Sequence, residues 1–224
     1  NSKDSLDKIV LHHWSNSYTS ESDLLQREIE AHKKTLFLAK DTDKGYATIR
    51  GVSVNNTTIP YSYYKGKKDL LAISLVKKLA PKDSIKIDFS YQTKLPSAAF
   101  SSYGKTSQGN FNLKYWHVVP AVYQNHTWQA ASHKNLGFRY ENRKNYSLHI
   151  STPKGYKIHS ELNNNKKYLR AHVLHVLKGN KRVNAPLYIY KEQTFETYKL
   201  PGFTVATNLK NKNLPKALKK SILK

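Results

Sequence analysis

FNLKYWHVVPAVYQNHTW, residues 111–128, is a dense run of aromatic and β-branched residues. Both kinds of residue favour strands over helices. Pro120 interrupts the run, and a proline is tolerated in a sheet only at an edge, at a strand start or at a bulge. We therefore predict two short strands joined by a bend at Pro120.

A second stretch, YSLHISTPKGYKI at residues 146–158, alternates along its first half. Tyr146, Leu148 and Ile150 fall on one face of a strand, and the residues between them are polar. Residues 152–155, Thr-Pro-Lys-Gly, have turn composition. The pattern predicts a hairpin that returns the chain through residues 156–158.

The remaining sequence predicts strands at residues 6–14, 47–54, 58–64, 69–75, 85–91, 166–177, 183–189, 192–198 and 203–207. A turn is expected at residues 178–181, and a Ser/Gly-rich loop at 96–109. The loop holds Gly104, Lys105 and Thr106 but lacks the spaced glycines of a phosphate-binding loop. We predict a mainly β fold, in which twisted antiparallel sheets pack as a sandwich or saddle.

Two short helices complete this prediction, one near each end of the chain. Ser20 and Asp23 match a capping box for a helix over residues 21–34. Its apolar face would carry Leu25, Ile29 and His32, with Leu36 on the same line. Near the C-terminus, apolar residues recur every four positions from residue 214, which indicates the start of a second helix.

The two quoted stretches together resemble the N-terminal β-domain of the aminopeptidase N family of zinc metallopeptidases. The residues that carry the resemblance are Trp116, Pro120, Ala121, Val122, Tyr123, Trp128, Leu148, Ile150, Pro153, Lys154 and Tyr156. The opening run DSLDKIVLHHWSNSY, residues 4–18, is similar to the bacterial branch of that family. The resemblance extends over most of residues 4–207, and none of its motifs is catalytic.

This resemblance implies a domain organisation and a role. Residues 1–190 would be the non-catalytic N-terminal domain, without its first strands, and residues 191–224 would begin the catalytic domain. The domain would cap the active-site cleft and help select peptide amino termini. Its partners would be the rest of its own polypeptide and the peptide substrate, in a periplasmic, cell-surface or secreted protein.

Tyr115 and Trp116 are the substrate-binding residues that the resemblance suggests. The family has a Gln or Glu just before the Trp, where it helps hold the free amino terminus of the substrate. Tyr115 occupies this position, and its ring face and hydroxyl could serve an ammonium group. The alternatives are a shifted register, a different mode of substrate binding, a relative without peptidase activity, or two aromatics that only pack in the sheet.

The sequence predicts no catalytic residue, metal site or cofactor in this chain itself. None of the ten histidines is followed by Glu, so the H-E-x-x-H motif of zinc peptidases is absent. His12 and His13, like His172 and His175, are spaced so that strand geometry points them to opposite faces. A site for another metal, assembled from distant histidines, stays open. The chain has no cysteine, no G-x-S-x-G motif and no apolar run of membrane-spanning length. The zinc of the parent enzyme would therefore be held by residues outside this chain.

The net charge of +23, from 38 Lys and Arg against 15 Asp and Glu, is extreme for a globular domain. It is typical of a polyanion-binding protein, but also of a lysine-rich proteome or of a domain beside an acidic neighbour. The lysines occur in every predicted loop, and no nucleic-acid motif accompanies them, so no specific nucleic acid is expected. Two other functions stay open: a basic β-sandwich that binds acidic glycans or a membrane surface, and a structural domain of an inactive peptidase relative.

Overall fold

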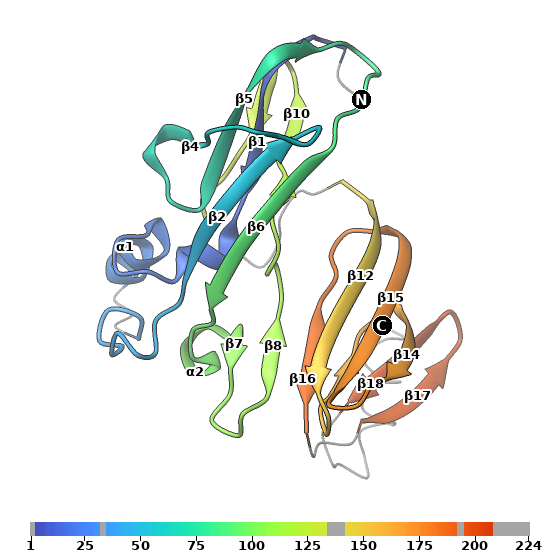
Figure 1. The fold of residues 1–224 in the computed structure, drawn as a ribbon. Helices are drawn as coiled ribbons and strands as arrows, with labels where there is room; N and C mark the ends of the chain where they lie inside the picture. Colours follow the sequence, from blue (N-terminus) through green and yellow to red (C-terminus); the bar gives the residue numbers. More distant parts are fainter. Residues whose placement is uncertain (1–2, 32–34, 134–141, 192–194, 208–224) are drawn as a thin grey trace.

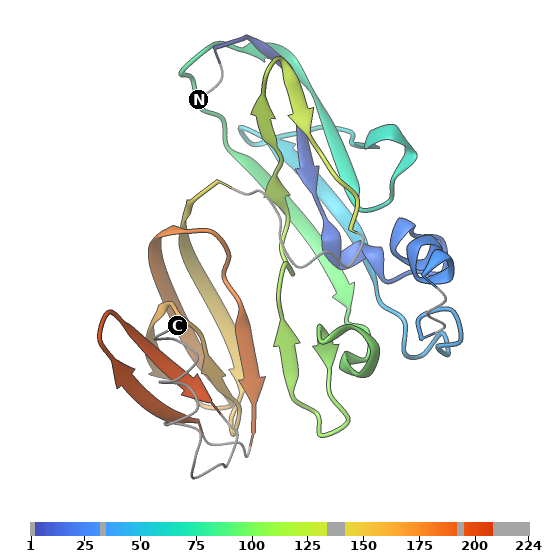
Figure 2. The same ribbon diagram turned by 180° about the vertical axis from the view of Figure 1, so that it is seen from behind.

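The computed structural model describes residues 3–31, 35–133, 142–191 and 195–207. The fold is mainly β with antiparallel sheets, as the sequence predicts. Figure 1 shows two β lobes side by side, and the view from behind in Figure 2 shows the same division. The predicted C-terminal helix lies outside the described residues.

The first lobe is built from two facing sheets and a separate hairpin. One sheet has the order β4-β5-β1-β9, the other has the order β3-β2-β6, and β10 pairs with β11. The bounds are β1 Leu6–His12, β2 Tyr46–Val54, β3 Thr57–Thr58, β4 Ser62–Tyr63, β5 Leu70–Leu79, β6 Ile87–Lys94, β9 Val119–Pro120, β10 Val122–Gln124 and β11 Thr127–Gln129. Its short helices are η1 Trp14–Ser17, α1 Asp23–Glu30, η2 Tyr64–Gly66 and α2 Ala98–Ser101.

The second lobe is a smaller sandwich that is joined to the first by β7 and β8. Its sheets have the orders β12-β15-β14 and β13-β16-β8-β7, and β17 and β18 form a separate two-stranded hairpin beside this sandwich. The bounds are β7 Gly104–Lys105, β8 Phe111–Leu113, β12 Lys144–Pro153, β13 Lys157–His159, β14 Asn163–Tyr168, β15 His172–Arg182, β16 Leu187–Tyr190, β17 Glu196–Leu200 and β18 Phe203–Thr207.

Strand alternation produces the core of the first lobe. Ile87, Phe89 and Tyr91 of β6 are half-buried, whereas Asp88 and Ser90 between them are exposed. The apolar face of β6 packs with buried residues of β1, β2 and β5. These are Leu6, Ile9, Leu11, Val52, Leu71 and Ile73. Burial of this face supplies the main driving force for folding of the lobe.

Trp116 and Leu113 connect the apolar clusters of the molecule. One cluster is the core of the second lobe, formed around Tyr146, Leu177 and Leu187. The other lies beside α1 and α2 and comprises Tyr18, Leu24, Leu36 and Tyr103. Trp116 and Leu113 pack against both clusters, so the 111–116 segment ties the second lobe to the helical end of the first.

The predicted hairpin around Pro153 is wrong in its pairing. Tyr146 is buried and Leu148 and Ile150 are half-buried, so the predicted phase of β12 is confirmed. However, β12 pairs with β15, whereas β13 pairs with β16 in the other sheet. The turn carries the chain from one sheet of the sandwich to the other, because Ile158 packs into the same core from the opposite side.

The prediction of one continuous strand at 166–177 is also wrong. These residues include the end of β14, a turn and the start of β15. Val173 and Leu177 are buried on one face as expected, but Leu169 lies in the turn, where its amide donates to the His172 carbonyl at 2.9 Å. The predicted turn at 178–181 lies inside β15 instead. An irregularity in the β12–β15 pairing accommodates its turn-like residues within the ladder.

Helix α1 is shorter than predicted and is rotated on its axis. Leu24 and Glu28 are buried, whereas Ile29 is 44% exposed. Ser22, not Ser20, caps the helix by accepting from the Leu25 amide. Glu28 faces inward because its carboxylate accepts from the Thr35 hydroxyl and the Leu36 amide, at 3.0 and 3.1 Å. His32 of the predicted face lies outside the described residues.

Pro120 lies in a short edge strand. The two strands predicted for residues 111–128 are instead four shorter strands. Strands β8, β9, β10 and β11 share residues 111–129. Val119 and Pro120 pair with β1, and the Ala121 amide donates to the Val10 carbonyl at 2.9 Å. Proline is tolerated there because β9 is an edge strand.

Pro96 is buried between two glycines where the chain leaves β6. A Cβ at Gly104 would lie 1.9 Å from the Pro96 carbonyl oxygen, and one at Gly45 would lie 2.6 Å from Pro96 Cδ. Gly104 also has a φ of 121°, which side chains of other residues rarely permit. The connection from β6 through α2 to β7 therefore requires glycine at this position.

Replacing Gly104 by Ala should destabilise the chain by about 2–4 kcal/mol, because the added methyl group clashes with backbone and the φ becomes strained. Gly51→Ala is the matched control, since nothing lies within 4 Å of its Cβ position and its φ is not positive. Its effect should stay within about 0.5 kcal/mol. Urea unfolding followed by tryptophan fluorescence measures both, and equal effects would contradict the clash.

Candidate functional site

The two residues that the sequence singles out lie in the loop between β8 and β9, at the junction of the lobes. Tyr115 has a φ of 54°, in the left-handed region that bulky residues rarely adopt. Its half-buried ring meets Trp14 edge-on, with centroids 5.4 Å apart. Lys114 Nζ lies 5.2 Å from the centroid of the same ring. Tyr115 is thus held in an uncommon conformation and already faces a cation.

Trp116 makes the contacts of a packing residue. Its indole Nε1 donates to the Ala185 carbonyl at 2.9 Å, across the junction to the second lobe. Its ring lies 5.0 Å from that of His117. These contacts fix the backbone on which Tyr115 sits. A role of either residue toward a substrate stays a prediction.

Trp14, which supports Tyr115, is itself fixed by the segment after β11. Its Nε1 donates to the Ala131 carbonyl at 3.0 Å. The His12 ring stacks on it with centroids 4.2 Å apart, and His12 Nε2 accepts from the Ala131 amide at 3.2 Å. The support beneath Tyr115 therefore comes from two distant parts of the sequence.

A buried carboxylate, Asp69, organises this support, and sequence reasoning missed it. One of its oxygens accepts from the Ser17 hydroxyl at 2.8 Å and from the His133 amide at 2.6 Å. The other accepts from the Ser132 hydroxyl at 2.7 Å. Charge-assisted bonds of this kind are strong, and they satisfy a carboxylate that is 4% exposed. The sequence contains one sign of this network, the run WSNSY at 14–18, in which polar residues lie between two aromatic ones. The structure shows that all five residues are buried.

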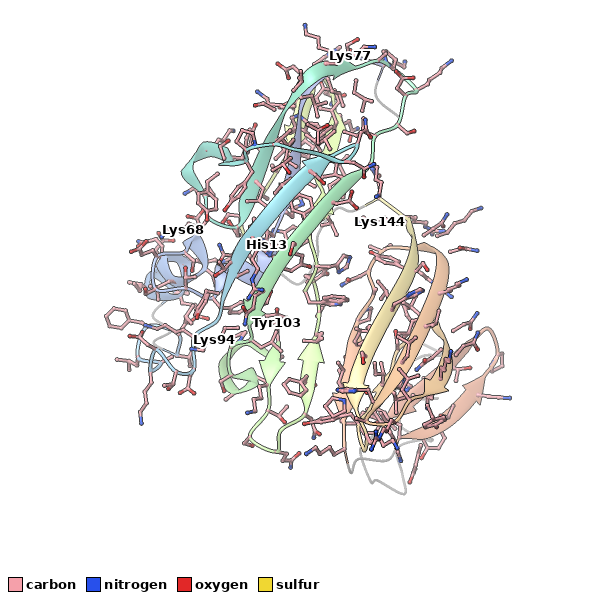
Figure 3. All side chains as sticks on the ribbon, viewed as in Figure 1. His13, Lys68, Lys77, Lys94, Tyr103 and Lys144 are labelled. Carbon is pink, nitrogen blue, oxygen red and sulfur yellow. The ribbon has the colours of Figure 1, made fainter. Side chains whose placement is uncertain are left out.

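His13 is buried and His117 is half-buried, and the ring nitrogens of both are inaccessible and have no hydrogen-bond partner in the described part of the chain. The His13 ring meets Tyr91 edge-on at 5.1 Å, and the His117 ring meets Tyr146 at 5.4 Å. Figure 3 shows His13 between the strands of the first lobe and Lys144 where the chain starts β12. Burial lowers the pKa of His13 to about 4, and burial together with the charge of Lys144 lowers the pKa of His117 to about 4.

The described ranges contain no group of three or more His, Asp or Glu side chains that could hold a metal ion. His172 is exposed while His175 is buried, so the predicted divergence of this pair is confirmed. His175 Nδ1 lies 3.1 Å from the Asn164 amide nitrogen and is engaged within the sandwich. Within the described ranges, the histidines and carboxylates therefore form no set of ligands for zinc.

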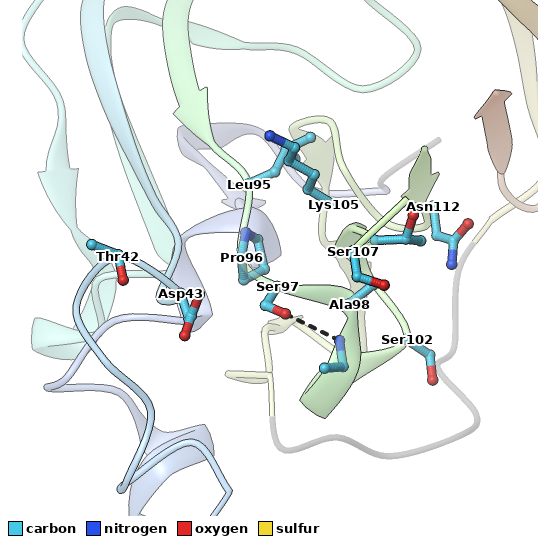
Figure 4. Close-up of a pocket in the computed structure, with 12 residues that line it drawn as sticks. Thr42, Asp43, Leu95, Pro96, Ser97, Ala98, Ser102, Lys105, Ser107 and Asn112 are labelled. Carbon is cyan, nitrogen blue, oxygen red and sulfur yellow. Dashed lines mark hydrogen bonds between the residues drawn. The ribbon is translucent and has the colours of Figure 1, made fainter. Parts of the chain in front are cut away.

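A cavity of about 600 Å³ lies where β6, α2 and β7 meet. Figure 4 shows the residues that line it. Hydroxyl groups, Asp43 and Lys105 line it. The Lys105 amide donates to the Pro96 carbonyl at 2.8 Å, and the Thr106 hydroxyl accepts from the Asn110 amide at 3.1 Å. The loop uses these groups to close on itself rather than to cradle a phosphate. Its sequence gave no indication of a nucleotide site either.

No protein-family model and no curated protein matches this chain. Solved structures do match it. A mutant M1 zinc metallopeptidase from Deinococcus radiodurans, bound to a Tyr-Ser-Ala substrate, has a TM-score of 0.51 and 8% identity. A mutant two-domain M1 zinc metallopeptidase bound to L-tryptophan has a TM-score of 0.50 and 10% identity. Each match covers 92% of this chain and 40% of the metallopeptidase chain.

The resemblance found in the sequence is thus confirmed at the level of the fold. This chain spans 40% of the length of the metallopeptidases that it matches. No helix of the described segments is both long and apolar enough to cross a membrane.

Acidification should destabilise the chain between about pH 6.5 and pH 4. The unfolded state binds protons on His13 and His117 in this range while the folded state does not, so their contribution is complete above pH 6.5 and is lost as the pH falls. The loss should approach roughly 3 kcal/mol for each residue at pH 4. Urea unfolding at a series of pH values measures it.

The variants His13→Phe and His117→Phe should each flatten this pH dependence. The exposed His149 offers the control, because His149→Gln should leave the slope unchanged. A slope that survives in both Phe variants would mean that other groups titrate.

Proposed function

We propose that this chain is the non-catalytic N-terminal domain of an aminopeptidase N-like zinc peptidase, and that it helps select peptide amino termini at the active-site cleft. The observation that carries the proposal is the fold likeness to M1 zinc metallopeptidases over 92% of the chain. The absence of H-E-x-x-H from the sequence supports it, since the zinc would be held by other residues of the polypeptide. Zinc would supply Lewis-acid chemistry there.

Tyr115 is the residue of this domain that we assign to the substrate. The Lys114 ammonium lies 5.2 Å from the centroid of its ring, which supports a role of the ring face toward a cation. The free amino terminus of a peptide is also an ammonium group and could take the place of Lys114. The left-handed backbone at Tyr115 supports this role, because such strain is maintained where the surrounding structure over-determines it, frequently at functional positions.

Residues 195–207 support the proposed boundary near residue 190. In the described part of the chain, β17 and β18 pair only with each other. A two-stranded hairpin is marginally stable by itself. We therefore assign residues 191–224 to the beginning of the catalytic domain, whose further strands would complete this sheet.

The chain by itself should hydrolyse no aminoacyl-nitroanilide and hold no stoichiometric zinc, because it lacks the ligand pattern. Spectrophotometric assay and metal analysis of the purified chain test this. One tightly held zinc ion for each chain, or turnover that a chelator abolishes, would contradict the assignment.

In the full-length polypeptide, Tyr115→Leu should raise KM for an aminoacyl substrate about tenfold with a smaller effect on kcat, because a cation–π contact of about 1–2 kcal/mol is lost. Tyr115→Phe keeps the ring and should retain most of the affinity. Tyr156→Leu is the matched control, since Lys191 Nζ lies 4.9 Å from the Tyr156 ring centroid. An unchanged KM in Tyr115→Leu would remove Tyr115 from the substrate site.

A further inference from the structure

The positive charge is unevenly balanced between the two lobes. Ion pairs in the first lobe join Lys44 to Asp41, Lys67 to Asp23, Lys68 to Glu21 and Lys86 to Asp88. Residues 142–191 contain eleven Lys and Arg against a single carboxylate, Glu161. The second lobe therefore carries a large excess of cations with almost no acid to neutralise them.

Two apolar side chains are exposed at the tip of the β14–β15 hairpin, inside this basic region. Tyr168 is 73% exposed and Leu169 is 43% exposed. Lys166 and Lys167 precede them and Arg170 follows, and all three are exposed. We call these five residues, together with Lys154, the hairpin tip.

Lys154 belongs to the hairpin tip through the fold rather than the sequence. Its amide donates to the Ala171 carbonyl at 3.3 Å, which places the β12–β13 turn beside the hairpin. None of the four cations of the hairpin tip forms an ion pair with another described residue. Apolar side chains and uncompensated cations thus share one projecting end of the lobe.

Protection of a sheet edge explains part of this arrangement but not all of it. Strand β14 is an edge strand, and lysines on an edge prevent pairing with other chains. That function accounts for Lys166 and Lys167. It does not account for an exposed Tyr-Leu pair at the turn, which adds no core packing and exposes apolar surface to water.

We propose that the hairpin tip is a docking surface for a membrane that contains anionic lipids. Lys and Arg are attracted to anionic headgroups and can extend their charged ends toward phosphates. Tyrosine is favoured at the membrane interface, and leucine gains by entering the acyl boundary. A soluble polyanion would use the cations but would leave Leu169 in water. The combination of charges and apolar residues therefore favours a membrane.

Another exposed apolar pair lacks this combination. Phe37 and Leu38 are 56% and 68% exposed, but the carboxylates Asp41 and Asp43 follow them closely in the chain. Lys40 and Lys44 balance these carboxylates, and Lys44 forms an ion pair with Asp41, so this segment lacks the excess of cations found at the hairpin tip. The proposed surface is independent of Tyr115 and of the peptidase assignment, so either proposal can fail without the other.

Sedimentation of the chain with vesicles tests the proposal. The chain should bind to vesicles of phosphatidylcholine that contain about 30% phosphatidylserine. It should bind hardly at all to vesicles of phosphatidylcholine alone. The triple variant Lys166→Gln, Lys167→Gln, Arg170→Gln should lower the partition coefficient at least tenfold. The double variant Tyr168→Ser, Leu169→Ser keeps every charge and should lower it severalfold.

The matched control removes three cations from the first lobe. Lys77→Gln, Lys78→Gln, Lys82→Gln has the same net charge as the hairpin-tip triple variant and should change partition less than twofold. Figure 3 shows Lys77 far from the second lobe. Thermal unfolding measures whether each variant is folded. Substitutions at exposed positions should leave the fold intact.

A direct reporter separates docking from general attraction. The variant Leu169→Trp should show a blue-shifted component in its fluorescence when anionic vesicles are added. Equal losses in the two triple variants would mean diffuse charge and would overturn the proposal. So would an absence of vesicle binding, or binding to heparin or RNA through these residues without vesicle binding.

Discussion

The buried carboxylate of Asp69 is the constraint on which the junction of this molecule depends. A carboxylate that is 4% exposed must have its oxygens satisfied by donors. Ser17, Ser132 and the His133 amide meet this need from two segments separated by over a hundred residues. Removing the Ser132 hydroxyl would leave one buried carboxylate oxygen without this donor, which costs more than an ordinary hydrogen bond is worth. Both segments must therefore dock together.

The hydrogen bonds of Asp69 fix the position of Tyr115 indirectly. Asp69 fixes Ser132 and His133, the adjacent Ala131 carbonyl orients the Trp14 indole, and Trp14 meets the Tyr115 ring edge-on. Trp116 fixes the other side of the loop through the Ala185 carbonyl. A loop residue with left-handed backbone would ordinarily relax. Here rigid contacts on both sides oppose relaxation, which is the arrangement that a binding residue requires.

The sequence predicted those features that depend on alternation within one strand. The inward face of β12 was assigned correctly, because burial of one sheet face imposes a period of two. Which strands pair with each other was harder to predict from the sequence. Gly179 and Asn180 have turn composition but lie opposite β12, whereas Leu169–Ala171 carries no turn signal and forms the turn. Tertiary contacts decided both cases. The positive φ of Tyr115 and the donors around Asp69 likewise arise from segments that only the fold brings together.

The low sequence identity to structures of the same fold indicates which residues the fold requires and which positions can vary. With 8–10% identity over 92% of this chain, inward apolar residues and turn geometry suffice to specify the architecture. Exposed positions are free to vary under that constraint. An exposed leucine and tyrosine among four cations therefore cannot be attributed to the fold. The fold therefore leaves the cations of the second lobe unexplained, and the proposed docking surface gives them a role.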